Sequence, residues 1–233
     1  MPECAYAHIK TYLNNNRVQI MSKDLGRELQ ECGAIKFEDF TLVSGVKSKY
    51  YIDIKKAITK PRILGIIRRH IIDKIIENNI KADYVACVEL GAVPIGVAVS
   101  LATGLPLIII RKVQKDYGIK NRIVGDIEKG KIVLFVEDVM TTGGTIINAV
   151  QVLRNEGMIV QKVISVVERN VEKSVERNVE KSVERNVERN VDRDEGAEEA
   201  LSKEGLTLIS LVRADTLLKY HDVEKMEESR LAI

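Results

Sequence analysis

The residues best suited to chemistry lie at 137–145, where two acidic residues precede a turn of threonines and glycines, EDVMTTGGT. Small residues let backbone N–H groups close around a phosphate, threonine hydroxyls donate to it, and a helix N-terminus adds partial positive charge. Carboxylates such as Glu137 and Asp138 accept hydrogen bonds from vicinal hydroxyls. The pattern therefore favours a ribose 5-phosphate over an inorganic phosphate. The alternative is a plain strand-to-helix connection, and the absence of G-x-x-x-x-G-K and G-x-G-x-x-G disfavours a P-loop or dinucleotide site.

A second candidate is the basic run RKVQKDYG at 111–118, which places Arg111, Lys112 and Lys115 within five residues. A polar stretch follows as far as Gly125 and could move as a lid. Basic surface loops usually serve only solvation. Because this one follows an expected strand end on the side of the phosphate turn, we interpret it as functional.

Two further segments admit both a functional and a structural interpretation. Residues 37–53, FEDFTLVSGVKSKYYID, offer a Ser-Gly turn and the rings of Tyr50 and Tyr51 to a small planar base, or form a β-hairpin with its tyrosines packed at an edge. Residues 88–96, VELGAVPIG, either bring backbone N–H groups to a ligand, with contacts from Glu89 and Gly91, or simply start a helix at Pro94.

The elements that must position these groups alternate between strands and helices. Apolar runs predict strands at 84–88, 105–110, 131–136, 160–167 and 206–212. Helices are expected at 22–32 with Ser22 as N-cap, from Pro61 with Ile63, Ile67, Ile71 and Ile75 on one face, and from near Pro94, Thr145 and Glu195. This order predicts an α/β fold with a mainly parallel sheet covered on both faces, with ligands beyond the carboxyl ends of the strands.

The composition excludes several classes. The 233 residues carry 36 basic and 34 acidic side chains, and the resulting net charge of +2 argues against a dedicated nucleic-acid surface. No apolar run reaches the roughly 18 to 20 residues that span a bilayer, and the N-terminus lacks a signal-peptide core, so no membrane association and a cytoplasmic location are expected. Cys4, Cys32 and Cys87 are too far apart for a C-x-x-C site and are expected to be free thiols.

A low-complexity insertion occupies 168–191, ERNVEKSVERNVEKSVERNVERNV, in which a valine recurs every four residues. On a 3.6-residue helix that spacing drifts by about 40° per unit, so no lasting apolar face forms. A marginal exposed helix and a disordered loop both remain open.

These motifs resemble those of one enzyme family. FVEDVMTTGGT is similar to the phosphoribosyl pyrophosphate (PRPP) motif of type I phosphoribosyltransferases, and residues 37–53 resemble the F-T-L-x-S-G-x-x-S-x-Y-Y-x-D signature of orotate phosphoribosyltransferases. Residues 111–118 resemble the family's catalytic loop, which enters the neighbouring subunit's site, and residues 88–96 its pyrophosphate loop. The resemblance implies one phosphoribosyltransferase domain over 1–233, with a small N-terminal hood at about 1–60, a flexible catalytic loop and a homodimeric assembly.

The resemblance also implies an activity, Mg²⁺-dependent transfer of the phosphoribosyl group from PRPP to orotate in UMP biosynthesis. Asp138 and Glu137 would hold the ribose hydroxyls, Lys115 would neutralise the departing diphosphate, and Mg²⁺ would be bound mainly through PRPP rather than by protein ligands. The implied PRPP contacts are Arg111, Lys112, Lys115, Tyr117, Glu137, Asp138, Val139, Met140, Thr141, Thr142, Gly143, Gly144 and Thr145. The implied orotate contacts are Thr141, Tyr51 and either Arg193 or Arg169.

The two arginines compete because the insertion interrupts the family pattern V-D-R-x-E-G-A. Arg169 follows the expected strand end at 166–167, whereas Arg193 keeps the downstream context, and removing 168–191 restores VVDRDEGA. We favour Arg193. Lysines of some family members are absent at Val43 and Gly91, so more diphosphate charge would fall on the basic run and Mg²⁺.

Tyr117 stands where histidine is commoner, and its phenol can donate a hydrogen bond but not a proton near pH 7. Two other functions are possible on this fold, a purine phosphoribosyltransferase and a PRPP-sensing regulator that binds nucleic acid. The segment 37–53 disfavours the first. The near-zero net charge and the complete R-K-x-x-K run disfavour the second.

Overall fold

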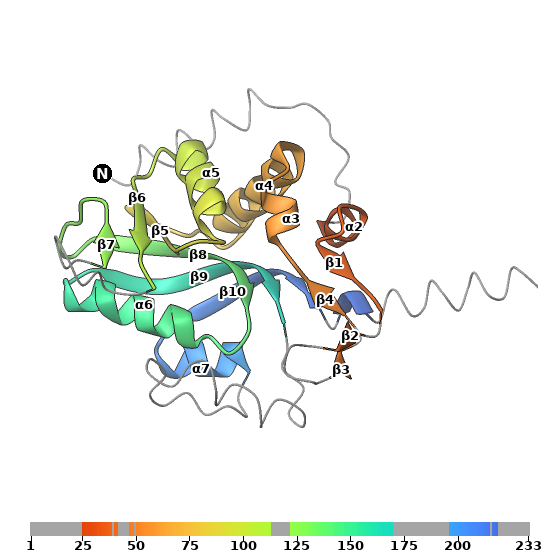
Figure 1. The fold of residues 1–233 in the computed structure, drawn as a ribbon. Coiled ribbons are helices and arrows are strands. Elements are labelled where there is room, and N and C mark those ends of the chain that lie inside the picture. Colours follow the sequence, from red (N-terminus) through yellow and green to blue (C-terminus); the bar gives the residue numbers. More distant parts are fainter. Residues whose placement is uncertain are drawn as a thin grey trace, which may run out of the picture.

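The computed structural model describes residues 25–38, 40–41, 47–48, 50–112, 122–169, 196–214 and 216–218. Its centre is a six-stranded sheet in the order β10-β9-β8-β5-β6-β7 (Figure 1). The strands are β5 (Tyr84–Val88), β6 (Leu107–Ile110), β7 (Ile123–Val124), β8 (Ile132–Met140), β9 (Ile159–Glu168) and β10 (Thr207–Arg213). All neighbouring pairs in this sheet are parallel except β6 with β7. The predicted mainly parallel α/β sheet is therefore confirmed.

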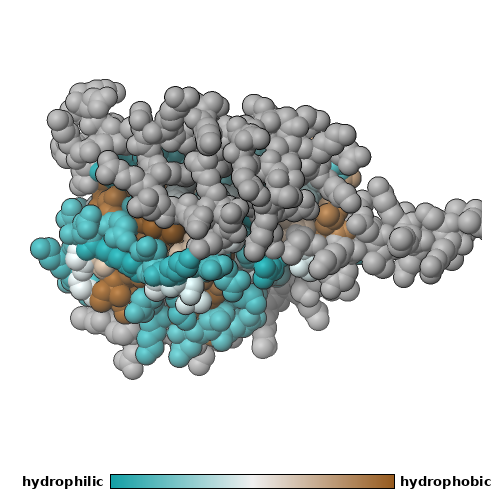
Figure 2. Space-filling model, turned by 90° about the horizontal axis from the view of Figure 1, so that it is seen from below, coloured by the Kyte–Doolittle hydropathy of each residue, from teal (hydrophilic) through white to brown (hydrophobic). Residues whose placement is uncertain are grey.

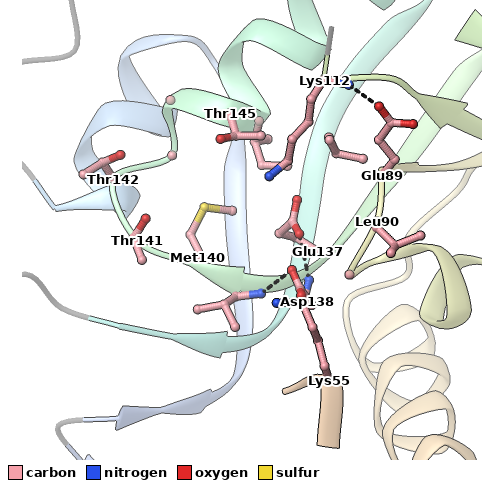
Figure 3. A pocket seen from close by; sticks show the side chains of 16 residues that line it. Lys55, Glu89, Leu90, Lys112, Glu137, Asp138, Met140, Thr141, Thr142 and Thr145 are labelled. Atoms are coloured by element: carbon pink, nitrogen blue, oxygen red, sulfur yellow. Dashed lines mark hydrogen bonds between the residues drawn. The ribbon is translucent and has the colours of Figure 1, made fainter. Parts of the chain in front are cut away.

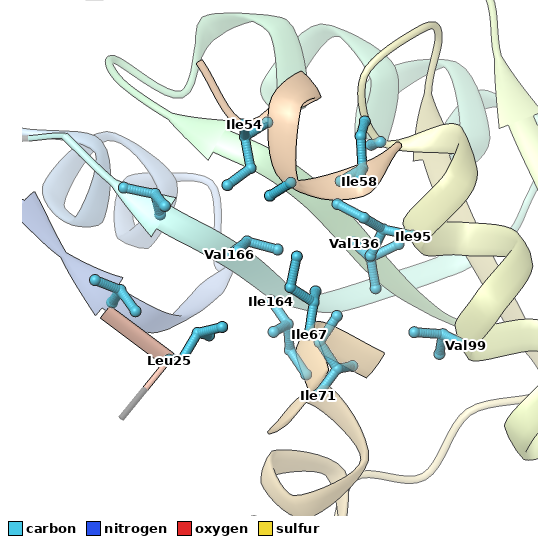
Figure 4. Packing of buried hydrophobic residues seen from close by; sticks show 14 of the residues in the cluster. Leu25, Ile54, Ile58, Ile67, Ile71, Ile95, Val99, Val136, Ile164 and Val166 are labelled. Atoms are coloured by element: carbon cyan, nitrogen blue, oxygen red, sulfur yellow. The ribbon is translucent and has the colours of Figure 1, made fainter. Parts of the chain in front are cut away.

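Helices cover both faces of the sheet, as expected. On one face lie α2 (Leu25–Glu31), α3 (Lys55–Ile58), α4 (Pro61–Glu77) and α5 (Val93–Thr103), and on the other α6 (Gly144–Asn155) and α7 (Ala197–Lys203). The isoleucines of α4 at i+4 spacing are all buried. Figure 4 shows Ile67 and Ile71 packed with Val99 of α5 and Ile164 of β9. This packing fixes the strand ends that carry the polar residues.

The opposite face, seen in Figure 2, is mainly hydrophilic where it is coloured, with smaller hydrophobic areas. This agrees with the exposed charged side chains of α7, including Glu198, Glu199 and Lys203. Within the described residues, no helix is both long and apolar enough to cross a membrane.

The N-terminal part folds as two small antiparallel ladders. β1 (Ile35–Lys36) pairs with β4 (Tyr51–Ile52), and β2 (Phe40–Thr41) pairs with β3 (Lys47–Ser48). The Tyr51 ring packs on Phe40 with centroids 5.4 Å apart. The hairpin interpretation of residues 37–53 is thus confirmed as a description of its structure. Arg62 of α4 forms a hydrogen-bonded ion pair with the buried Glu28 of α2, which ties α2 to α4.

Several boundaries differ from the sequence prediction. The strand expected at 131–136 continues to Met140, because Glu137, Val139 and Met140 keep the ladder to β9. The stretch expected to be polar as far as Gly125 ends in a short strand, since Ile123 and Val124 pair with β6 as β7. Glu168, expected in the insertion, is buried in β9. α3 was not predicted, α7 begins at Ala197 and so agrees with the start expected near Glu195, and Ser22 lies outside the described residues.

Candidate active site

A cavity of about 270 Å³ opens at the carboxyl ends of β5 and β8 (Figure 3). This is where a parallel sheet binds its ligands. Its described lining consists of Lys55, Val88, Glu89, Leu90, Gly91, Lys112 and residues 137–146. The whole predicted phosphate segment and the Glu89–Gly91 turn thus line the same cavity as Lys112.

The phosphate turn connects β8 to α6 without a side-chain cap among the described residues. Gly143 occupies the N-cap position with φ +84°, a conformation that glycine adopts without the cost of a Cβ. The first backbone N–H groups of α6 therefore have no partner within the helix and carry partial positive charge. Thr141, Thr142 and Thr145 lie beside them in the cavity wall. This is a suitable site for a phosphate.

The two carboxyl groups beside the turn have different environments. Glu137 is only 7% exposed, and its Oε1 accepts the backbone N–H of Asp138 at 3.0 Å. Asp138 is half-buried, and its Oδ1 accepts the N–H of Val139 at 2.9 Å. Burial raises the pKa of Glu137 well above its usual range. The hydrogen bond with the Asp138 side chain and the negative charge of Asp138 raise this pKa further, while the positive charge of Lys112 lowers it. Glu137 thus resists ionisation until a cation approaches.

Arg111 and Lys112, the first two residues of the basic run, are fixed by hydrogen bonds to Glu89 and to Arg122. The N–H of Lys112 donates to Glu89 Oε1 at 3.0 Å, and the N–H of Arg111 donates to the Arg122 carbonyl at 2.8 Å. Arg122 Nε returns a bond to the Arg111 carbonyl at 3.1 Å. Lys112 reaches the cavity, whereas Arg111 is not among the described lining residues, and Lys115 and Tyr117 lie outside the described residues.

Gly91 shows why the turn after β5 is built from small residues. A Cβ at this position would lie 1.9 Å from Asp138 Oδ2, so the Asp138 carboxyl group occupies the space of a side chain. The turn therefore approaches the acidic pair closely. Glu89, expected as a ligand contact, lines the cavity, and its Oε1 accepts the N–H of Lys112.

Of the expected orotate contacts that the structure describes, Thr141 lines the cavity, whereas Tyr51 and Arg169 are not among its described lining residues. The N–H of Arg169 donates to the Met140 carbonyl at 2.8 Å, and its guanidinium lies 5.7 Å from the Tyr50 ring centre. Tyr51 is 40% exposed and packs on Phe40. Arg193 lies outside the described residues. Sequence reasoning missed Lys55, which precedes Pro61 in a charged run that carries no phosphate-binding motif.

The mainly parallel sheet, the uncapped helix start and the carboxylate pair at one strand end define an α/β protein with a site suited to a phosphorylated sugar. Residues 55–196 match the phosphoribosyl transferase domain. An orotate phosphoribosyltransferase of Methanosarcina acetivorans is 43% identical over 204 residues, which span 88% of this chain and 95% of the relative. The chain therefore belongs to the phosphoribosyltransferase family, and this relative is an orotate phosphoribosyltransferase.

Solved structures agree with this assignment. The crystal structure of orotate phosphoribosyltransferase from Aeropyrum pernix matches with a TM-score of 0.67 at 26% identity, over 85% of this chain and 98% of that one. The orotate phosphoribosyltransferase of Mycobacterium tuberculosis H37Rv in complex with PRPP matches with a TM-score of 0.59 at 25% identity, over 84% of this chain and 99% of that one.

Proposed function

We propose that the chain transfers the phosphoribosyl group of PRPP to orotate, giving orotidine 5′-monophosphate and pyrophosphate, in the synthesis of UMP. The observation that carries the proposal is the shared cavity, in which an uncapped helix start and a carboxylate pair lie side by side. The names of the relatives and the PRPP complex of a structural neighbour support it.

In this reaction, cleavage of the C1–O bond develops positive charge on the ribose and negative charge on the diphosphate. Catalysis is therefore mainly electrostatic and positional. Asp138 and Glu137 hold the ribose hydroxyls and stabilise the cationic sugar. The turn of residues 141–145 holds the 5′-phosphate through its amides and hydroxyls. Val139 and Met140 form the adjoining wall of the cavity.

Mg²⁺ is the proposed cofactor. It prefers oxygen ligands and would reduce the charge on the diphosphate. The described residues include no group of three or more His, Cys, Asp or Glu side chains placed to hold an ion. The carboxylates of Glu137 and Asp138 are suitable oxygen donors, but PRPP itself would provide most of the ligands.

The basic run supplies cations to the diphosphate in this proposal. Lys112 already lines the cavity, and Lys115, Arg111 and Tyr117 would join it from the same run. We also propose a homodimer in which this run completes the neighbouring site, and a cytoplasmic location.

For the orotate carboxylate we now propose Arg169 as the partner. Its backbone continues the ladder between β8 and β9, and its guanidinium stacks on Tyr50 of the orotate-type segment. These contacts hold it beside the end of β8. Arg193 is the alternative that the downstream sequence context favours.

The test is an orotate-consumption assay on the full chain with PRPP and Mg²⁺, with hypoxanthine, guanine and xanthine as comparison bases. Orotate turnover alone supports the proposal, and turnover of a purine base alone refutes it. Arg169→Gln and Arg193→Gln should be compared in the full chain, because deleting 168–191 would move Arg193 into the place of Arg169. A rise in the KM for orotate in only the first variant supports Arg169.

A further inference from the structure

Lys55 lines the cavity but lies in none of the segments that the sequence marks as functional. It begins the four-residue helix α3, in which Ala57 and Ile58 are 0% and 7% exposed, and Ile54 at the N-cap is 2% exposed. These three side chains anchor the short helix in the main hydrophobic cluster. Lys55 and Lys56 are both exposed, and of the two only Lys55 lines the cavity. The core thus fixes the backbone that presents Lys55.

The side chain of Lys55 is directed at the acidic pair. Figure 3 shows it extending from α3 toward Asp138, whereas Lys112 enters from the other side of Glu137. In the same view Lys55 lies on the side of Leu90 and away from Thr141 and Thr142. It therefore approaches the part of the cavity that the phosphate turn does not occupy.

The acidic side chains of the cavity favour a cation on the side of Asp138 that faces α3. The described lining has three acidic side chains, Glu89, Glu137 and Asp138, and two basic ones, Lys55 and Lys112. The turn at Gly91 has no space for a side chain of its own, because the Asp138 carboxyl group occupies it. An incoming diphosphate would be repelled by the Asp138 carboxylate unless a cation faces it, and Lys55 is the described cation on this side.

We propose that Lys55 binds the diphosphate group of PRPP, from the side of the cavity opposite Lys112. This inference rests on the proposed function. The 5′-phosphate is excluded as its partner because the turn of residues 141–145 already provides amides and hydroxyls for one phosphate, on the far side of the acidic pair.

The experiment compares Lys55→Ala, Lys55→Gln and Lys55→Arg in the full chain with Lys56→Ala, a matched control one residue away. Removing the ammonium group should raise both the KM for PRPP and the inhibition constant of inorganic diphosphate about 10- to 100-fold. Binding of orotidine 5′-monophosphate, which has the 5′-phosphate and no diphosphate, should stay within about twofold of the unmodified chain. Lys55→Arg should keep most of the affinity, and Lys56→Ala should behave like the unmodified chain.

Equal diphosphate constants for Lys55→Ala and Lys56→Ala would overturn the proposal, as would an equal loss of orotidine 5′-monophosphate binding. Lys55→Gln keeps the length of the side chain and replaces Lys55→Ala if that variant does not fold. Calorimetric titration of the protein with inorganic diphosphate and Mg²⁺ tests Lys55 without turnover. If the unmodified chain fails to convert orotate yet shows Lys55-dependent diphosphate binding, the proposed reaction fails and the diphosphate contact stands.

Discussion

Two buried glutamates end neighbouring strands of the same sheet, and their surroundings differ. Glu168, at the end of β9, is 5% exposed, accepts the Ser210 hydroxyl at 2.8 Å and lies 3.8 Å from Arg213. Glu137, near the end of β8, is 7% exposed and has the like-charged Asp138 as its neighbour. Among described residues, the first carboxylate has its counter-charge within the fold, while the second faces a cavity.

The difference indicates which glutamate stabilises the protein and which serves a ligand. Burial of a charge is costly unless it is paired and hydrogen-bonded. The pairs around Glu168 offset that cost inside the chain. For Glu137 the compensation would have to come from a bound cation or sugar hydroxyl, which is typical of functional sites with perturbed pKa values.

The largest expected effect concerns turnover. Asp138→Asn and Glu137→Gln each remove a carboxylate from the developing cationic sugar, and kcat should fall about 10²- to 10³-fold. Glu168→Gln should change kcat less than about tenfold, because its carboxyl group is turned to Ser210 and Arg213. Initial rates of orotate consumption at saturating PRPP measure all three. A similar fall for Glu168→Gln would remove the distinction between the two glutamates.

The next largest effect is on stability, and here Glu168 rather than Glu137 should be the residue whose carboxylate stabilises the fold. Glu168→Ala should lower the free energy of unfolding by about 1–3 kcal/mol, because it leaves the Ser210 hydroxyl without its acceptor at a buried site. Glu198→Ala is the matched control: it removes another carboxylate near Arg213, but one that is 69% exposed, and should cost at most about 1 kcal/mol. Urea denaturation followed by circular dichroism measures both. Equal losses would show that burial of Glu168 contributes nothing.

Glu137→Gln should instead raise stability at neutral pH. The pKa of Glu137 is raised in the folded protein above its ordinary value of 4.5, so both states hold the proton below that pH and no penalty exists there. As pH rises from 4.5 to the folded pKa, the unfolded state ionises first and the unmodified protein loses stability. The gain in the variant should therefore grow across this window, by about 1.4 kcal/mol for each pH unit between the two pKa values.

Melting temperatures of the unmodified protein and Glu137→Gln between pH 4 and pH 8 measure this divergence. Parallel curves over the whole range would contradict it. Asp138→Asn provides a second comparison at the half-buried neighbour.

The sequence predicted the features that depend on residues close together in the chain. The apolar run, the acidic pair and the Thr-Gly turn follow one another directly, so β8, its carboxylates and the start of α6 could be placed from residue types alone. The isoleucines of α4 were predicted for the same reason, because their i+4 spacing repeats over several turns.

The remainder depends on residues distant in the chain. Glu168 has the same local sequence as the repeat units after it, and only Ser210 and Arg213, more than 40 positions later, distinguish it. α3 is a single turn with no period to detect, so Lys55 could not be assigned to the cavity. β7 is two residues long and is defined only by its pairing with β6. For the orotate arginine the sequence favours Arg193 through its downstream context, and the sequence alone does not contain the contact of Arg169 with Tyr50.

The smallest expected effect tests whether the hydroxyl at the end of β10 is part of what makes Glu168 different. Ser210 donates to Glu168 at 2.8 Å and accepts the Ser165 hydroxyl at 3.1 Å, so Ser210→Ala removes one hydrogen bond from each neighbour. The expected loss of stability is about 0.5–1.5 kcal/mol, with kcat unchanged because Ser210 does not line the cavity. In a cycle with Glu168→Ala the two losses should be less than additive, since both variants remove the same bond. Full additivity would mean that Arg213 alone compensates the buried charge.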